Sequence, residues 1–342
     1  MGCKNCKGEN ENETEIFTID DEKLNKKMKR KDILLKSKSP NKLNSTLKKL
    51  LKKKFSEIDS NISFEEISMD KFEKILNKNP YYKRTLKNLK EEINEILFEE
   101  NIKYDNIIPI KIKGPSGEEQ YYQGGYNDNG NCHGPGIWVQ NNNIYFGNFT
   151  NDEFSGKGVY INSKGDYYFG DWTHNKFNGQ GSLVVDGIET YQGDFKDNKK
   201  WGEGIENFKN LDIYYGHFYN GEKNGNGKYI FSEGSVYEGK FNNSKIDGNG
   251  KIKFKDGKKY IGEFQNGEIT GKGELIYDNG VKFKGEYLME KKNGKGEYIW
   301  PDGKQFKGIW KNNVLEQGVF EDKDNKIVEK IENKNGLICN NK

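Results

Sequence analysis

The chain has 342 residues, of which 32% are hydrophobic, 32% are charged and 41 are glycine. A globular core of several layers needs more Leu, Val and Ile than this, and the apolar residues are weighted instead toward 20 Tyr, 20 Phe and 5 Trp. The net charge of +3 is unevenly distributed, because residues 1–120 hold 26 basic and 22 acidic side chains (+4) and residues 121–342 hold 30 and 31 (−1).

The N-terminus begins with the residues MGCKNC. Removal of the methionine would expose Gly2, which resembles an N-myristoylation site, and Cys3 and Cys6 are placed for S-palmitoylation. Cys6 departs from the Ser or Thr preferred at its position. Unmodified thiols are the simpler alternative, and half of a zinc site is a third, for which Cys132 and Cys339 are single and distant partners. We expect lipid on these three residues and no metal.

No run of about 18 apolar residues occurs, so we expect no membrane-spanning segment and no secretory signal. Four cysteines in a chain of this length do not make a disulfide framework, so we expect a reducing, cytosolic setting. Acylation is then the remaining route to a membrane.

A cationic stretch runs from Lys23 to Lys54 and holds 14 Lys and Arg residues against one acid, Asp32. One acyl chain holds a protein at a membrane only marginally, and each basic side chain near an anionic surface adds about 1 kcal/mol. A solvated charge run is the alternative, and nucleic acid is not expected because no aromatic residues are interleaved. We predict a basic arm that binds anionic lipid through Lys26, Lys27, Lys29, Arg30, Lys31, Lys48, Lys49, Lys52, Lys53 and Lys54.

Two helices are predicted before residue 120. Residues 45–55 place Leu47, Leu50, Leu51 and Phe55 on one face of a basic amphipathic helix. We therefore assign residues 1–60 to a disordered, acylated arm that contains this helix. A second helical pattern runs over 81–100 and is followed by an extended stretch at 107–112. We interpret 61–119 as a helical cap and linker that shields the first hairpin or the aromatic face; a helix reserved for a partner or for dimerisation is the alternative.

An aromatic-x-Gly-x-aromatic signature recurs nine times with its glycines 23 residues apart, from Tyr122 to Trp310. A second signature, Gly-x-Gly, begins nine residues after that glycine in the seven internal copies, for example at Gly156 and Gly158. The residues that define the repeat include Tyr145, Gly147, Phe149, Tyr168, Gly170, Trp172, Tyr191, Gly193, Phe195, Tyr237, Gly239, Phe241, Tyr260, Gly262 and Phe264. Such strict periodicity predicts a repeat array, with atypical units at its ends.

The spacing within each repeat predicts a β-hairpin. Alternation along a strand puts Tyr145, Gly147 and Phe149 on one face, so that a ring from one hairpin can lie over the bare glycine of the next. The opposite face is expected to be polar, with residues such as Asp171 and Glu263. We predict a mainly β fold: an elongated single-layer antiparallel meander of about nine hairpins over 120–320, preceded by a partly helical, partly disordered extension and followed by a polar tail at 321–342.

The pattern resembles the MORN (membrane occupation and recognition nexus) repeat. The resemblance covers about residues 120–320 and implies protein docking in membrane-associated or cytoskeletal structures, including cilia. No catalytic constellation is visible, since His133, His174 and His217 fall at different repeat positions, and no cofactor is expected.

We therefore predict a non-catalytic scaffold at the cytoplasmic face of a membrane, which binds protein partners along the repeats and anionic lipid through the arm. The alternative is a structural subunit of a cytoskeletal or ciliary assembly. A homodimer is left open.

Overall fold

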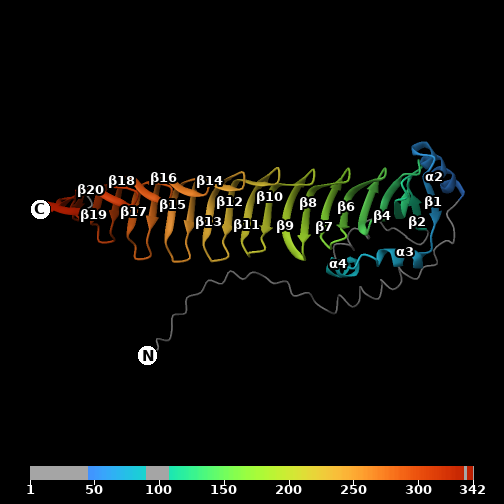
Figure 1. The fold of residues 1–342 in the computed structure, drawn as a ribbon, viewed down its shortest axis with the longest axis horizontal. Coiled ribbons are helices and arrows are strands. Elements are labelled where there is room, and N and C mark those ends of the chain that lie inside the picture. Colours follow the sequence, from blue (N-terminus) through green and yellow to red (C-terminus); the bar gives the residue numbers. More distant parts are fainter. Residues whose placement is uncertain (1–44, 90–107, 335–336, 342) are drawn as a thin grey trace, which may run out of the picture.

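The computed structural model describes residues 45–89, 108–334 and 337–341. They form one antiparallel sheet of 22 strands and three short helices. Each strand pairs with its neighbours in the sequence, from β1 to β22. Figure 1 shows the resulting ribbon, with the helices at one end and the C-terminal strands at the other. The predicted fold class, an elongated antiparallel meander of hairpins, is confirmed.

The nine predicted repeats form nine hairpins of two strands each. Their strands are β3 (Glu119–Tyr126), β4 (Cys132–Gln140), β5 (Asn143–Thr150), β6 (Glu153–Ile161), β7 (Tyr167–Thr173), β8 (Lys176–Val185), β9 (Ile188–Lys196), β10 (Lys199–Asn207), β11 (Ile213–Tyr219), β12 (Glu222–Ile230), β13 (Val236–Asn242), β14 (Lys245–Lys253), β15 (Lys259–Gln265), β16 (Glu268–Ile276), β17 (Lys282–Leu288), β18 (Lys291–Ile299), β19 (Gln305–Lys311) and β20 (Val314–Glu321).

The sheet extends beyond the repeats at both ends. β1 (Ser63–Glu66) pairs with β2 (Ile110–Lys113), which pairs with β3, so the stretch expected to be extended at 107–112 joins the sheet. At the other end β21 (Ile327–Lys334) and β22 (Leu337–Asn341) add two strands within the segment expected to be only a polar tail. The boundary predicted at residue 320 therefore does not coincide with the end of the sheet.

The central glycines of all repeats lie in one row across the sheet. Gly147 is paired with Gly136 on one side and with Gly158 on the other, and the same pairing continues to Gly308 and Gly318. The first glycine of each internal Gly-x-Gly has another role: Gly156, for example, has a φ of 58° beside the point where the register of β5 and β6 shifts. This glycine accommodates a β-bulge, where a residue with a side chain would be strained.

The three helices are α2 (Ser45–Ile58), α3 (Met69–Leu76) and α4 (Tyr82–Asn88). The first corresponds to the helix expected at 45–55 and is one turn longer. The last corresponds to the start of the helix expected at 81–100, of which residues 90–107 lie outside the described part of the chain. Ser68 caps α3 by accepting a hydrogen bond from the amide of Lys71.

The helices cover two different faces of the sheet. In α2, Leu51 and Phe55 pack into the aromatic core that begins at Tyr122. On the other face, Phe72, Ile75 and Leu76 of α3 pack with Phe146 and Val159. Figure 1 shows α3 and α4 alongside the first repeat hairpins.

The interpretation of the second face as uniformly polar is therefore wrong for the first repeats. There it carries apolar residues such as Phe146 and Val159, because helices cover it. The helical cap predicted for 61–119 is present, but α3 and α4 shield this second face, whereas α2, which we had assigned to the arm, shields the aromatic one.

Candidate docking surfaces

A row of fully buried rings forms the core of the aromatic face. The first aromatic residue of the signature is at most 1% exposed in eight of the nine repeats, and Phe306 in the last is 8% exposed. Each ring covers the glycine pair of its own hairpin: a methyl group added to Gly158 would lie 2.4 Å from the hydroxyl of Tyr145. This corrects the expectation that a ring lies over the glycine of the next hairpin, because the paired strand of the same repeat brings its glycine closer.

Contacts between repeats are made ring to ring. Tyr145 meets Phe149 of its own repeat and Trp172 of the next edge-to-face, with centroids 5.2 Å apart in both pairs. Tyr168 and Phe195 continue the series at 5.1 Å. Such pairs contribute about 0.5–1.5 kcal/mol each beyond their burial. The repeat-defining residues thus make the contacts both within and between repeats.

Each buried tyrosine also donates a hydrogen bond to the backbone. The Tyr145 hydroxyl donates to the carbonyl of Asn148 at 2.9 Å, and the Tyr237 hydroxyl to that of Lys240 at 3.0 Å. Burial raises the pKa of Tyr237 and of Tyr260 to about 12. These phenols are therefore protonated donors at neutral pH, with a structural role.

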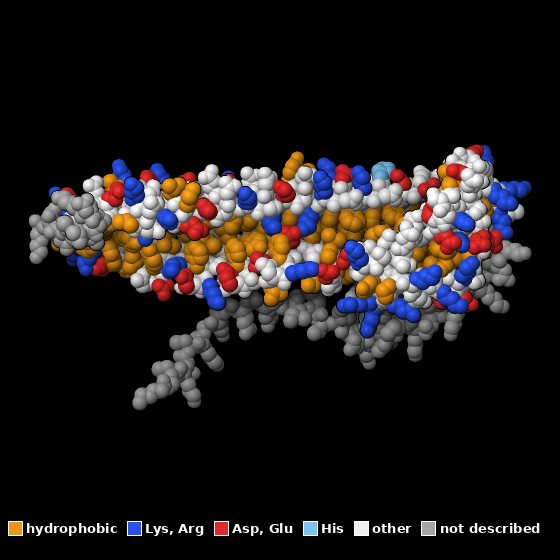
Figure 2. Space-filling view, in the orientation of Figure 1, with side chains coloured by type: hydrophobic (Ala, Val, Ile, Leu, Met, Phe, Trp, Pro, Cys, Tyr) orange, Lys and Arg blue, Asp and Glu red, His pale blue; other side chains and the backbone are white. Residues whose placement is uncertain are grey.

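A second set of apolar side chains lies over this core and is partly exposed. These residues recur every 23 positions on the second strand of each hairpin and just after it, and we call them the apolar band: Phe154, Tyr160, Phe177, Leu183, Phe208, Tyr229, Phe231, Ile246, Ile252, Phe254, Ile269, Leu275, Tyr277, Tyr298, Trp300 and Leu315. Figure 2 shows it as a continuous hydrophobic stripe along the long axis, with charged side chains gathered on both rims.

Charged side chains interrupt the apolar band. Glu206, which is 14% exposed, pairs with Lys200 and, at 3.1 Å, with Lys223. The ammonium group of Lys223 lies 4.6 Å from the ring centroid of Phe208 and 5.5 Å from that of Tyr214. Cation–π contacts and ion pairing together compensate for the partial burial of these charges. The middle of the band is therefore a polar landmark within an apolar surface.

The opposite face opens into a trough over the last repeats. Its volume is about 910 Å³, and it extends from β15 to β21. Glycines such as Gly285 and Gly296 form its floor, and Lys and Glu side chains such as Lys284 and Glu297 line it. These positions correspond, repeat by repeat, to those that α3 and α4 cover at the other end. We call this surface the charged trough.

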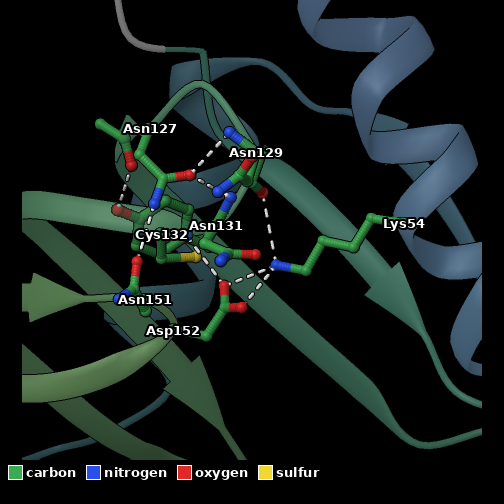
Figure 3. Close-up of polar contacts among 10 residues, drawn as sticks. Lys54, Asn127, Asn129, Asn131, Cys132, Asn151 and Asp152 are labelled. Carbon is green, nitrogen blue, oxygen red and sulfur yellow. Dashed lines mark hydrogen bonds and ion pairs between the residues drawn. The ribbon is translucent and has the colours of Figure 1, made fainter.

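The first hairpin is joined to α2 by a cluster of polar contacts. The ammonium group of Lys54 lies 2.6 Å from the Asp152 carboxylate and donates to the carbonyl of Gly130 at 3.3 Å. The same carboxylate accepts from the amide of Cys132 at 2.8 Å. Figure 3 shows Lys54 reaching from the helix to this turn. Burial, reinforced by Asp152, raises the pKa of the Cys132 thiol to about 12, so that the thiol is protonated at neutral pH.

The predicted arm is only partly described. Gly2, Cys3, Cys6, Lys26, Lys27, Lys29, Arg30 and Lys31 lie outside the described residues. Of the lysines on α2, Lys48 pairs with Glu66 and Lys54 with Asp152, whereas Lys49, Lys52 and Lys53 are exposed. The apolar side of α2 packs on the repeats, so only these three lysines of the helix face solvent fully.

Among the described residues no helix is both long and apolar enough to cross a bilayer. The described residues also contain no cluster of three or more His, Cys, Asp or Glu side chains placed to hold a metal ion. His174 and His217 lie at the surface, within 2.6 Å of Glu153 and 2.7 Å of Glu203 respectively.

Sequence reasoning missed the apolar band and the lysines within it. The signal was present, because Phe208, Phe231, Phe254, Tyr277 and Trp300 are each 23 residues apart. They lie at or beyond the end of the second strand, outside both glycine signatures, where alternation alone does not predict the face. The role of α2 was also missed, since its amphipathic pattern is the same for a membrane and for a protein surface.

The fold and its two continuous faces define a solenoid of β-hairpins, a repeat protein in which each unit contacts mainly its neighbours. The MORN repeat family model matches residues 145–167, 168–184, 191–212, 214–236, 237–259, 260–282 and 283–305. The chain is a MORN-repeat protein. A search of curated protein sequences found no significant match.

Proposed function

We propose that this MORN-repeat protein is a non-catalytic scaffold that docks a protein partner along its apolar band. The observation that carries the proposal is the band itself: a solvent-accessible hydrophobic stripe that continues through consecutive repeats. Extended apolar surfaces rimmed by polar residues are typical of protein interaction sites. The buried row of rings beneath holds the band rigid, so binding orders few side chains.

Site-specific photo-crosslinking in the source cell tests the docking face. A photoreactive phenylalanine analogue is placed at Phe254, in the apolar band, and in a second strain at Ile261, in the charged trough. We expect a discrete adduct from position 254 and none from 261, which is 51% exposed and serves as the matched control. Adducts from 261 alone would assign the partner to the trough and refute the docking face.

We further propose that the N-terminal arm holds the scaffold at the cytoplasmic face of a membrane. The support is the sequence Gly2-Cys3 with Cys6, followed by the basic stretch, which together supply the two signals that stable anchoring needs. On α2, Lys49, Lys52 and Lys53 extend this basic surface, while its apolar side is already used. The arm, rather than the repeats, then provides the membrane affinity.

A Gly2→Ala variant tagged at its C-terminus tests the anchor. We expect the wild-type protein in the membrane fraction and the variant in the soluble fraction, with Gly8→Ala as the control for an alteration of the arm. If the Gly2→Ala variant keeps its position, the anchor proposal fails and the alternative, a subunit of a cytoskeletal or ciliary assembly, takes its place.

A further inference from the structure

A cavity lies between α2 and the first hairpins and is separate from the apolar band and the trough. Its volume is about 510 Å³, within the usual range of small-molecule pockets, roughly 300–1,000 Å³. Leu51, Phe55, Ile62, Ile110 and Ile112 contribute apolar side chains to its wall. The cavity is thus lined mainly by hydrocarbon and lies directly under the helix that follows the arm.

Two buried polar atoms at this cavity have no hydrogen-bond partner in the described part of the chain. They are the hydroxyl of Tyr126 and one carboxyl oxygen, Oε2, of Glu118. Burial raises the pKa of Tyr126 well above its usual range, so its hydroxyl is a donor at neutral pH. Buried polar groups are nearly always paired, so an unpaired donor and an unpaired acceptor on one apolar cavity indicate a missing ligand.

The chemistry of the cavity favours an acyl amide. A hydrocarbon chain fits the apolar wall, an amide carbonyl can accept from Tyr126, and an amide N–H can donate to Glu118. A free fatty acid would instead bring a carboxylate close to two carboxyl groups, Glu118 and Asp152, of which the latter already pairs with Lys54. The acceptor in the wall therefore selects a neutral head group over an acidic one.

The chain carries a candidate source of such a group. An acyl chain on Gly2 would be joined to the protein through an amide. About 40 residues separate Gly2 from Ser45, where α2 begins, and at roughly 3.3 Å per residue this tether can reach the cavity many times over. A flexible tether of this kind gives an effective concentration in roughly the millimolar range.

We propose that this cavity binds the acyl chain of the chain's own Gly2, so that the arm alternates between the cavity and a membrane. The proposal rests on the N-terminal acylation assumed in the proposed function. When the acyl chain occupies the cavity, one of the two membrane signals is withdrawn. The exposed Lys49, Lys52 and Lys53 then bind an anionic surface without a lipid anchor.

A titration with a fluorescent peptide tests the cavity. The probe is a peptide of residues 2–10 with a myristoyl group on Gly2, added to the full chain produced without acylation. We expect it to bind, the unacylated peptide not to bind, and tetradecanoate to compete at least tenfold more weakly than the unlabelled acyl peptide. We also expect full chain myristoylated at Gly2 to bind the probe at least tenfold more weakly, because its own acyl chain occupies the cavity.

Three variants locate the binding site, and circular dichroism checks that each is folded. Ile62→Trp fills the cavity and should abolish binding, whereas Ile261→Trp, on the trough, should not change it. Tyr126→Phe should weaken binding about three- to tenfold, the effect of one hydrogen bond. Tyr287→Phe is the matched control, because Tyr287 holds the same repeat position with an equally unpaired hydroxyl and lies outside the cavity.

The outcomes separate this inference from the proposed function. No binding of the acyl peptide, or binding unaffected by Ile62→Trp, overturns the cavity assignment. Equal competition by tetradecanoate makes the cavity a free-lipid site, and unchanged probe binding by the acylated chain excludes occupancy by its own arm; either result refutes the proposal. Mass spectrometry of the N-terminus from the source cell tests acylation alone, and a negative result there removes the anchor whatever the titration shows.

Discussion

At the scale of single residues, the second glycine of each Gly-x-Gly provides the space in which the buried ring lies. We predict that Gly158→Ala lowers the free energy of unfolding by about 2–3 kcal/mol, the usual cost of overpacking, because the added methyl group would lie 2.4 Å from the Tyr145 hydroxyl. Denaturant unfolding followed by circular dichroism measures it.

Gly117→Ala is the control for this prediction. Gly117 has a φ of +86° with nothing within 4 Å of an added methyl group, so it should cost only the left-handed conformation, about 1 kcal/mol. Equal effects of the two substitutions would mean that ring packing is not what requires glycine at position 158.

At the scale of the element, the hairpins turn through two residues that both have positive φ. Asn266 and Gly267 do so at 52° and 96°, as suits a tight turn between twisted strands. Met289 and Glu290 adopt the same conformation, at 48° and 63°, without a residue that favours it. We predict that replacing this pair by Asn-Gly raises the free energy of unfolding by about 1 kcal/mol, measured by denaturant unfolding.

The reverse exchange tests the same reasoning. Converting Asn266 and Gly267 to Met and Glu should lower the stability by a similar amount, because the backbone geometry of the two turns is alike. A stability gain in both variants would show that the side chains, and not the left-handed backbone, determine the effect.

At the scale of the whole molecule, the row of buried tyrosines couples stability to alkaline pH. The pKa of Tyr237 and Tyr260 rises from 10.0 to about 12 in the folded chain. Below pH 10 both states keep these protons, so the contribution is constant. Above pH 10 the unfolded state releases them first and therefore binds fewer protons, so stability falls as pH rises toward about 12.

Circular dichroism and tyrosinate absorbance, recorded together against pH, check this prediction. We expect the sheet signal to be lost together with a cooperative rise in tyrosinate. The variant with Tyr237→Phe and Tyr260→Phe should show a shallower fall, and the natural Phe283 shows that phenylalanine fits this position. Free titration near pH 10 with an intact sheet would contradict the assignment.

The periodic part of the fold was determined by the sequence itself. The spacing of Tyr145, Gly147, Phe149 and Gly158, repeated every 23 residues, specifies a hairpin whose two strands share one face, because strand alternation and positive-φ glycines are local properties. The number and position of the hairpins followed directly from it.

What lies against each face was decided only by the tertiary structure. The pattern of α2 predicts an amphipathic helix but not whether Leu51 and Phe55 meet lipid or Tyr122, since both are apolar. The cavity at Tyr126 and Glu118, and the helices over Phe146, depend on residues some 50 to 90 positions apart in the chain. A repeat constrains contacts between neighbouring strands, whereas the packing of non-repeated helices depends on shape complementarity that no local period records.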